Sequence, residues 1–462
     1  MNLHRMLLAR AEENMPIRVA LIGAGKFGSM FLAQALHTPG IHILGVADLS
    51  VDKARAAMLA TGWPKDRIEA TSPAKALATG ATFLTDDAEP LINAGGLDVV
   101  IEATGIPESG IRHALISIER GRHIIMVNVE ADVLAGPLLA EKARQAGIVY
   151  SLAYGDQPAL ICEQVDWARA SGFEVVAAGK GTLYMPEFHA STPETVWDHY
   201  GLTPERAEES GLNPKMFNSF LDGTKSGIEM AAVANATGLT PAPAGLTFPP
   251  CPVEKLAATL IPETDGGILH HKGQVEVISS RARDGKDLKN DLRWGVYVTF
   301  EAPSDYVEKC FSDYGLITDP EGKYSALWRP FHLIGLELGI SVATVALLGM
   351  PTGAPTGFRA DVVACAKRDL AEGEILDGEG GYTVWGRLMV AGDSLTLGGV
   401  PIGLAQGLAL KKPIKEGAII QWSDLKVQGL EDSVAFAQRH EMEAAFGLRP
   451  ETAPETAEAA AG

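Results

Sequence analysis

The chain has 462 residues, enough for two or three domains with buried cores. Hydrophobic residues make up 46% and charged residues 21%, the usual balance of a globular protein. The net charge of −19 argues against binding to nucleic acid or to an anionic membrane surface, because both partners require basic patches. The longest apolar stretch, residues 340–350, is too short to span a bilayer.

The cysteines and the first residues bear on the compartment. The first fifteen residues carry charge throughout and lack the apolar core of a signal peptide. The cysteines form neither a CxxC pair nor a zinc-binding spacing, and we expect them to be reduced thiols: Cys162, Cys251, Cys310 and Cys365. The sequence therefore predicts a cytoplasmic protein.

Residues 16–153 have the pattern of a Rossmann domain. An apolar strand at 17–22 runs into a glycine turn, and a helical pattern follows to residue 36. Further apolar strands alternate with helices, with strands expected at 41–47, 81–84, 97–103, 123–129 and 149–153 and helices at 52–61, 111–120 and 133–145. This alternation predicts an α/β fold with a doubly wound parallel sheet covered on both faces.

The pattern changes after residue 153. Residues 154–357 predict an α+β catalytic and dimerisation domain on an open sheet, whose exposed face would make the protein a homodimer. A nearly unbroken apolar helix is expected over 332–348, buried and returning toward the Rossmann domain. Residues 358–430 predict a third unit with a weak internal echo, since 366–376 and 410–420 share a basic start, a glycine turn and an apolar close. We interpret 431–462 as a C-terminal tail, disordered at 451–462.

A G-x-G-x-x-G motif lies between the first strand and the helix that follows it. Gly23 permits the tight turn, Gly25 lets a pyrophosphate approach the backbone, and Gly28 lets helix and strand pack closely. Lys26 and Phe27 complete the loop and are expected to contact the cofactor. The helix N-terminus would then hold the phosphates of a dinucleotide.

Asp48 ends the second strand, twenty residues after Gly28. An acid there receives the ribose 2′-hydroxyl of NAD and repels the 2′-phosphate of NADP. Lys53 and Arg55 follow closely and could contact that phosphate, so NAD and NADP both remain open. Alternatively, Asp48 is a solvent-exposed acid at a strand end.

Polar residues also follow two central strands. Thr104 and Gly105 close the fourth strand and Asn128 the fifth. We expect all three beside the cofactor, because ligands collect at the carboxyl ends of strands in open α/β sheets. Glu130 comes next and is either catalytic or an acid favoured at a helix N-terminus.

The order of these elements resembles homoserine dehydrogenase, notably V-I-E-A-T-G at 100–105, H-I-I-M-V-N at 123–128 and Y-S-L-A-Y-G-D-Q-P at 150–158. The third unit resembles a small, mostly β SAF (antifreeze-like) domain through K-R-D-L-x-x-G-x-x-L at 367–376. The combination resembles the 1-deoxy-D-xylulose 5-phosphate reductoisomerase-like family. Val129 stands where homoserine dehydrogenases carry Lys, and Lys225 and Glu229 would exchange the charges of the Asp and Lys that the family carries four residues apart on a central helix. These departures argue against homoserine itself as the substrate.

The resemblance implies an NADPH-dependent reductoisomerase of isoprenoid biosynthesis. It would convert 1-deoxy-D-xylulose 5-phosphate, a small phosphorylated substrate, to 2-C-methyl-D-erythritol 4-phosphate. It would use NADP in preference to NAD, and possible divalent metals are Mg²⁺ and Mn²⁺. One alternative is a homoserine-dehydrogenase-like NAD(P) dehydrogenase of another small polyol, hydroxy acid or semialdehyde. Another is a non-catalytic sensor that binds a dinucleotide or a carbohydrate.

Three charged residues are the main candidates for chemistry in the second domain. Lys225 and Glu229 are spaced i, i+4 and so share one face of a helix. Lys225 would polarise a carbonyl or bind a phosphate, with Glu229 or Asp222 orienting it; the alternative is a solvated ion pair. Lys180, between two glycines at a strand end, either meets a ligand or points into water.

Asp156 begins the second domain, where pockets between domains commonly form. It is either a ligand of Mg²⁺ or Mn²⁺ or the N-cap of a helix that begins at Pro158. Arg329 precedes the apolar 332–348 segment and could bind a phosphate. The histidines show no metal-binding spacing and are interpreted as structural or surface residues.

Overall fold

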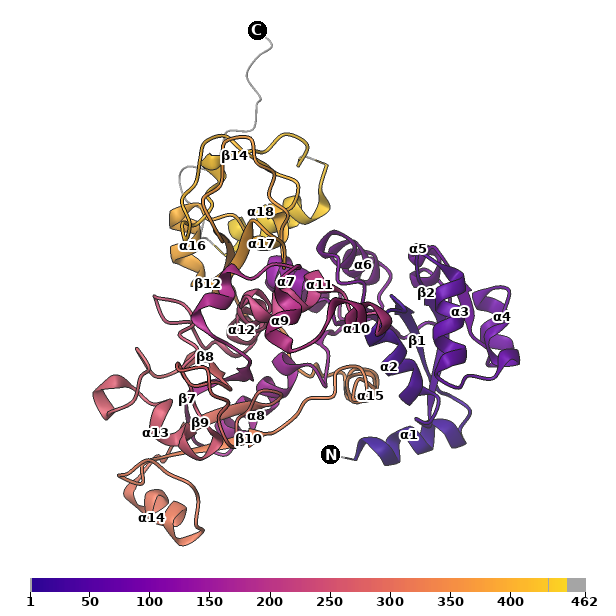
Figure 1. Ribbon diagram of the computed structural model, residues 1–462. Coiled ribbons are helices and arrows are strands. Elements are labelled where there is room, and N and C mark those ends of the chain that lie inside the picture. Colours follow the sequence, from indigo (N-terminus) through magenta and orange to yellow (C-terminus); the bar gives the residue numbers. More distant parts are fainter. Residues whose placement is uncertain (1, 431, 447–462) are drawn as a thin grey trace.

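The computed structural model describes residues 2–430 and 432–446, and the stretch 451–462 lies outside them. In Figure 1 the N-terminal part, the middle part and the C-terminal part of the chain occupy three regions that meet around helices α7 and α12. No helix among the described residues is long and apolar enough to cross a membrane.

A six-stranded parallel sheet forms the N-terminal part, in the order β3-β2-β1-β4-β5-β6 typical of a Rossmann fold. Its strands are β1 Ile17–Ile22, β2 Ile41–Ala47, β3 Phe83–Thr85, β4 Val99–Glu102, β5 His123–Met126 and β6 Tyr150–Leu152. Its helices are α1 Leu3–Glu12, α2 Lys26–Ala35, α3 Val51–Ala60, α4 Pro73–Thr79, α5 Ala88–Ile92, α6 Pro107–Glu119 and α7 Val129–Gln145. The parallel α/β fold expected from the sequence is confirmed.

A mixed four-stranded sheet in the order β10-β9-β7-β8 forms the middle part. Its strands are β7 Glu174–Thr182, β8 Gln274–Ser279, β9 Val296–Glu301 and β10 Tyr324–Arg329. Helices α8 (Gln157–Ala170) and α12 (Thr224–Thr237) pack on one face, and an apolar cluster around α13 (Leu256–Thr259) covers the other. The expected exposed face is therefore wrong, because β8 and β9 are buried along their whole length. The homodimer stays a prediction.

The helix expected over 332–348 is shorter than predicted. Only α15 (Gly339–Ala343) and a π-helical turn (Thr344–Leu348) are helical. Gly335 interrupts the pattern with a φ of +76°, and a Cβ there would lie 2.9 Å from the carbonyl oxygen of Phe27. The apolar run thus comprises a series of turns that packs against α2 and a short helix, whose residues Val342 and Ala343 join the Rossmann core.

The C-terminal part is built on the antiparallel pair β11 (Ala360–Ala366) and β12 (Val384–Val390). The remaining elements are α16 Ala391–Leu397, α17 Ile402–Ala405, β13 Ala409–Leu410, β14 Leu425–Lys426 and α18 Val434–Ala445. The two segments of the internal echo pair with each other, since Leu370 and Ile414 exchange backbone hydrogen bonds of 2.8 and 3.0 Å. The interpretation of everything after 430 as a tail is wrong, because α18 packs on α6 and α7.

Helix α12 lies at the centre of the molecule. It contacts α7 of the Rossmann part, α8 and β8 of the middle part, and β11 and β12 of the C-terminal part. Its residues from Ser226 to Asn235 are all buried, as expected of a helix that packs on every side. The Thr224 hydroxyl accepts a hydrogen bond from the backbone N–H of Gly386 (2.8 Å). The side-chain oxygen of Asn235 accepts hydrogen bonds from the backbone N–H groups of Arg359 and Ala360.

Candidate active site

A cleft of about 810 Å³ lies where the three parts meet. Its lining contains many of the site residues predicted from sequence: Gly25, Lys26, Phe27, Thr104, Gly105, Asn128, Glu130, Asp156, Lys180, Lys225 and Glu229. The C-terminal part contributes Glu379, Ile402, Gly403 and Gln406. One cavity therefore joins the predicted dinucleotide site to the predicted catalytic lysines.

The glycine loop has the geometry that its motif predicts. Gly23 has a φ of +98°, and a Cβ there would lie 2.6 Å from the carbonyl oxygen of Ala103. A Cβ at Gly28 would lie 2.3 Å from the carbonyl oxygen of Gly23. Gly25 has no atom within 4 Å of its Cβ position, which leaves open space at the N-terminus of α2. The loop thus fits a pyrophosphate.

Asp48 holds the glycine loop to the end of β2. Its carboxylate accepts hydrogen bonds from the backbone N–H groups of Ala24 (2.8 Å) and Ser50 (3.1 Å). The side chain is thus not an unengaged acid in solvent, and its predicted contact with the ribose stays a prediction. Lys53 is exposed and Arg55 is half-buried on the first turns of α3 nearby.

The polar residues after β4 and β5 form a hydrogen-bonded group on the cleft floor. The Asn128 side chain caps α7 by accepting from the N–H of Ala131 (3.1 Å), and its amide donates to the carbonyl of Ile106 (3.0 Å). The Thr104 hydroxyl donates to Glu102 (2.5 Å). Glu102 is fully buried, and sequence analysis did not single it out. The available signal was a carboxylate at the end of an otherwise apolar strand.

Four charged residues that line the cleft form what we call the lysine–glutamate cluster: Lys180, Glu229, Lys225 and Glu130. Lys180 of β7 forms an ion pair with Glu229 of α12 and donates to the side chain of Gln157 (3.0 Å). Lys225 of α12 pairs with Glu130 of α7, across the boundary between the two parts. The side chains are 5–16% exposed, so these pairs are not solvated surface contacts.

This pairing corrects the predicted roles. Glu229 was expected to orient Lys225, but its carboxylate bonds Lys180 instead. Asp222 does not line the cleft. It precedes α12, accepts from the N–H of Thr224 (2.9 Å) and forms a fully buried ion pair with Lys367 of the C-terminal part (2.7 Å). It thereby joins the start of α12 to the C-terminal part.

Asp156 occupies the N-cap of α8, the alternative to a metal ligand, and accepts from the N–H of Gln157 (2.8 Å). Burial, together with the charge of Glu229, raises the pKa of Asp156 to about 6. Within residues 2–430 and 432–446 there is no group of three or more His, Cys, Asp or Glu side chains placed to hold a metal ion. The described residues therefore do not form the metal site suggested for Asp156.

The charges in the cleft keep Lys225 protonated. Burial alone would lower the pKa of Lys225, but the carboxylates of Glu130 and Glu229 outweigh it and raise that pKa above its ordinary value. An ammonium group held in this way is suited to stabilise negative charge on a substrate oxygen.

Arg293 is a cation of the cleft that sequence analysis missed. Its guanidinium lies over the rings of Trp294 (4.9 Å) and Tyr200 (5.8 Å) and forms no ion pair within the described part of the chain. Arg329, predicted to bind a phosphate, instead pairs with Glu337 (2.5 Å) and does not line the cleft. Glu337 captures it because the 332–338 segment is not helical. The available signal for Arg293 was a basic residue just before a buried strand.

Residues 155–338 match the family described as "Oxidoreductase DRL, catalytic domain". A search of the curated proteins finds no significant match. Among solved structures, myo-inositol dehydrogenase from Corynebacterium glutamicum ATCC 13032 aligns with 14% identity and a TM-score of 0.27, over 39% of this chain and 48% of that chain. The myo-inositol dehydrogenase of Lactobacillus casei, solved with NAD(H) and myo-inositol, aligns with 16% identity and a TM-score of 0.27, over 40% and 52%.

These structural alignments cover about half of each solved protein. The family match is coarser than the reductoisomerase-like family expected from the sequence, since it names an oxidoreductase catalytic domain and covers the middle part of the chain. That domain and the Rossmann domain, with its dinucleotide-type glycine loop, share one cleft. The middle part of the chain thus matches an oxidoreductase catalytic domain, and it borders a Rossmann domain with a dinucleotide-type glycine loop.

Proposed function

We propose that the protein is a dehydrogenase that interconverts an alcohol and a carbonyl on a small polyol, hydroxy acid or semialdehyde. One observation carries the proposal: the glycine loop and the lysine–glutamate cluster line the same cleft. The volume of about 810 Å³ is in the range of cofactor and small-molecule sites. A substrate between the loop and the cluster would have one face toward each.

Each residue of the cluster has a distinct task in this reaction. A bound nicotinamide supplies or accepts the hydride. Lys225 donates a hydrogen bond to the substrate oxygen and stabilises the negative charge that develops there, while Glu130 holds its ammonium group in place. Lys180 is held by Glu229 and Gln157 and presents a second ammonium group to the same space. The two carboxylates thus orient two cations that the substrate can share.

We propose NADP(H) as the preferred cofactor. The carboxylate of Asp48 already accepts two backbone N–H groups, so it is less available to a ribose 2′-hydroxyl. Lys53 and Arg55 lie beside it on α3 and supply positive charge for a 2′-phosphate. A K53A/R55A variant should lower the ratio of kcat/KM for NADPH over NADH about tenfold, equivalent to about 1.4 kcal/mol. An unchanged ratio would remove the basis for this preference.

The dehydrogenase proposal is tested by assaying the purified protein with NADPH, NADH and their oxidised forms against a panel of polyols, hydroxy acids and semialdehydes. We expect turnover of at least one substrate class, with kcat/KM lowered about 10³-fold in K225M. Tight dinucleotide binding without turnover of any panel member would contradict the proposal and favour the non-catalytic sensor.

A second candidate, the reductoisomerase, is favoured by the cations of the cleft. Arg293 has no acidic partner among the described residues, and Lys215 lies in the same lining, so both could bind a phosphate. The assay uses 1-deoxy-D-xylulose 5-phosphate and NADPH, with Mg²⁺ or Mn²⁺ and with chelator. Formation of 2-C-methyl-D-erythritol 4-phosphate supports this candidate, whereas NADPH oxidation without skeletal rearrangement leaves the simple dehydrogenase.

A further inference from the structure

The C-terminal part reaches into the candidate active site through the loop between β11 and β12. This loop docks on α11 (Pro214–Leu221), where the Asn218 side chain donates to the carbonyl of Gly380 (3.0 Å). Lys367 donates to the carbonyl of Gly381 (2.7 Å). Gly380 has a φ of +65°, and a Cβ there would lie 2.0 Å from the carbonyl oxygen of Lys215. The loop is therefore held in one position, with Glu379 toward the cleft.

From these contacts, and on the basis of the dehydrogenase function proposed above, we propose that Glu379 stores a proton beside the Lys225–Glu130 pair and returns it to Lys225 during carbonyl reduction. Glu379 is in this sense a positioning residue, because it acts on the substrate through Lys225. The C-terminal part thereby completes the active site.

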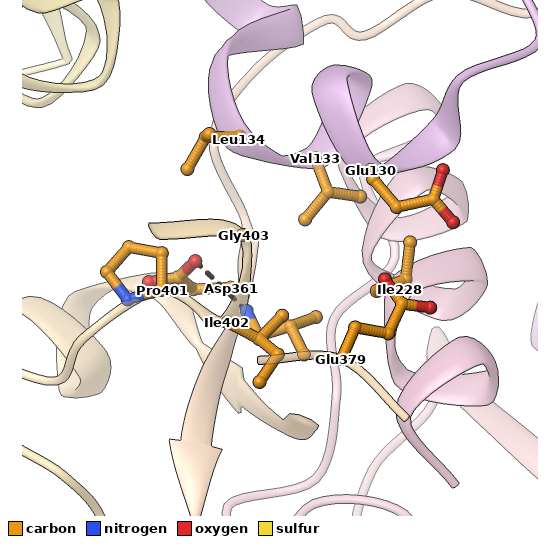
Figure 2. A pocket seen from close by; sticks show the side chains of 10 residues that line it. Glu130, Val133, Leu134, Ile228, Asp361, Glu379, Pro401, Ile402 and Gly403 are labelled. Atoms are coloured by element: carbon orange, nitrogen blue, oxygen red, sulfur yellow. Dashed lines mark hydrogen bonds between the residues drawn. The ribbon is translucent and has the colours of Figure 1, made fainter. Parts of the chain in front are cut away.

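The geometry of two cavities supports this role. Glu379 lines the main cleft together with Glu130 and Lys225, and its carboxyl group accepts a hydrogen bond from the Ser219 hydroxyl. Glu379 and Glu130 also line a small cavity of about 10 Å³, close to the size that holds one water molecule. In Figure 2 the two glutamates lie on one side of this cavity and Pro401 and Asp361 on the other. The cavity offers a short route for a proton between the two carboxyl groups.

The surrounding charges favour a proton on Glu379 near neutral pH. Burial raises the pKa of Glu379 to about 7, with Glu130 and Asp222 also raising it and Lys225 and Ser219 lowering it. The other acids near it are already compensated, because Asp222 pairs with Lys367 and Asp361 with Arg439. Across the cleft, Glu229 pairs with Lys180, while Asp156 has a pKa raised to about 6 by burial. Among these acids, Glu379 is thus the one whose protonation most directly reduces the unfavourable negative charge.

The proton balance of the reaction is complete. As the carbonyl carbon receives hydride from the reduced nicotinamide, the C=O π-electrons move to oxygen, and that oxygen takes a proton from the Lys225 ammonium group. The resulting Lys225 amine takes a proton from the Glu379 carboxylic acid, which becomes a carboxylate and is reprotonated from solvent. Oxidation of the alcohol runs the same transfers in reverse. Reduction should therefore weaken as the pH rises through about 7, where Glu379 loses its proton.

The key variant is E379Q, which keeps a hydrogen-bond acceptor for Ser219 but cannot release a proton in this range. The matched control is E372Q, an exposed glutamate in the same loop region. We expect E379Q to lose about 100-fold in kcat for reduction, at the low end of general acid–base contributions, and to lose the step in the pH profile near 7. E372Q should keep both. S219A should move the step to higher pH, because the Ser219 hydrogen bond lowers the pKa of Glu379.

A second measurement does not depend on turnover. Infrared difference spectroscopy of the cofactor-free protein should show carboxylic acid C=O bands that titrate near pH 7, and E379Q should lose the part of this signal that does not come from Asp132 and Glu276. If E379Q shows the same signal as wild type or keeps the kinetic step, Glu379 is not the stored proton and the inference is overturned. If the band is lost but no substrate is turned over, the dehydrogenase function fails while the placement of the acid stands. E379D, with restored titration and partial activity, would separate this role from mere packing.

Discussion

The glycine loop and the lysine–glutamate cluster line the same cleft but are specified in different ways. The loop is one short segment, in which Gly23 and Gly28 occupy positions where a Cβ would clash with backbone and Gly25 leaves open space. The cluster takes its residues from β7, α12 and α7, which lie far apart in the sequence. The glycine loop for dinucleotide binding is therefore encoded by one local segment, whereas the arrangement of the catalytic charges depends on how three parts of the chain pack.

The same ion-pair chemistry also serves two purposes around α12. Lys225–Glu130 faces the cleft and retains some exposure, 16% and 13% of the side chains. The side chains of Lys367 and Asp222 are buried, with only 2% and 0% of their surface exposed. A charge that a ligand can reach can act on that ligand, while a sealed pair can act only on stability. Variants on each side of this divide should therefore affect different measurements.

The largest effect is expected for K225M. Loss of the ammonium group should lower kcat/KM about 10³-fold, as for the removal of a preorganised group that stabilises the transition state. Dinucleotide affinity should stay within a few-fold of wild type, because the glycine loop is untouched. Steady-state kinetics and a fluorescence titration of the cofactor check both points. A kcat/KM within tenfold of wild type would place the chemistry elsewhere.

The sealed pair should behave in the opposite way. K367M leaves Asp222 buried without its partner, which should lower the free energy of unfolding by about 3–5 kcal/mol. Denaturant unfolding measures this, and K411M, at an exposed lysine of the C-terminal part, is the control. The kcat per folded molecule should fall far less than in K225M, because Asn218 still holds the loop that carries Glu379. A normal stability with lost activity would mean that Asp222 acts in catalysis after all.

Asp132 allows the same comparison within a single helix, because it lies two residues after Glu130 in α7 and is fully buried. Burial raises the pKa of Asp132 to about 7, although the Tyr150 hydroxyl donates to it (2.8 Å) and lowers it. The folded state then binds a proton more tightly than the unfolded state. The stability this contributes is fully present below the unfolded pKa and is lost as the pH rises through about 7.

The side chain of D132N stays neutral at every pH. The free energy of unfolding of this variant should therefore increase relative to that of wild type as the pH rises. The two proteins should have similar stability near about pH 4, with the variant more stable by up to about 4 kcal/mol above about pH 8. Thermal unfolding across this range provides the measurement. A constant difference at all pH values would show that Asp132 is ionised in the folded protein.

The smallest effects are expected in the glycine loop, where two neighbouring glycines should separate stability from binding. G28A forces a Cβ against the carbonyl oxygen of Gly23 and should cost about 1–3 kcal/mol of stability. G25A meets no protein atom, so its melting temperature should be unchanged, while dinucleotide affinity falls about tenfold, or about 1.4 kcal/mol. Equal losses of stability in both variants would contradict this assignment.

The features that could be predicted from sequence are those with a local cause. The glycine motif follows a buried strand and opens a helix, so it could be recognised without knowing that the end of β4 packs against Gly23. The alternating strands and helices of the Rossmann part are periodic, and Lys180 stands out because glycines flank it. The 332–348 segment misled for the same reason: it is apolar throughout, but Gly335 turns against α2, a contact outside the segment.

By itself, the sequence determined the Rossmann domain, its glycine loop and the residue types available for catalysis. Only the tertiary structure decided which charges meet: Lys225 with Glu130, Lys180 with Glu229, and Asp222 with Lys367. Only it brought Arg293 and Glu379 to the cleft. The physical reason is the distance along the sequence over which each interaction acts. Backbone conformation depends mainly on neighbouring residues, whereas the partner of a buried charge depends on which opposite charge the packing of α12 places beside it.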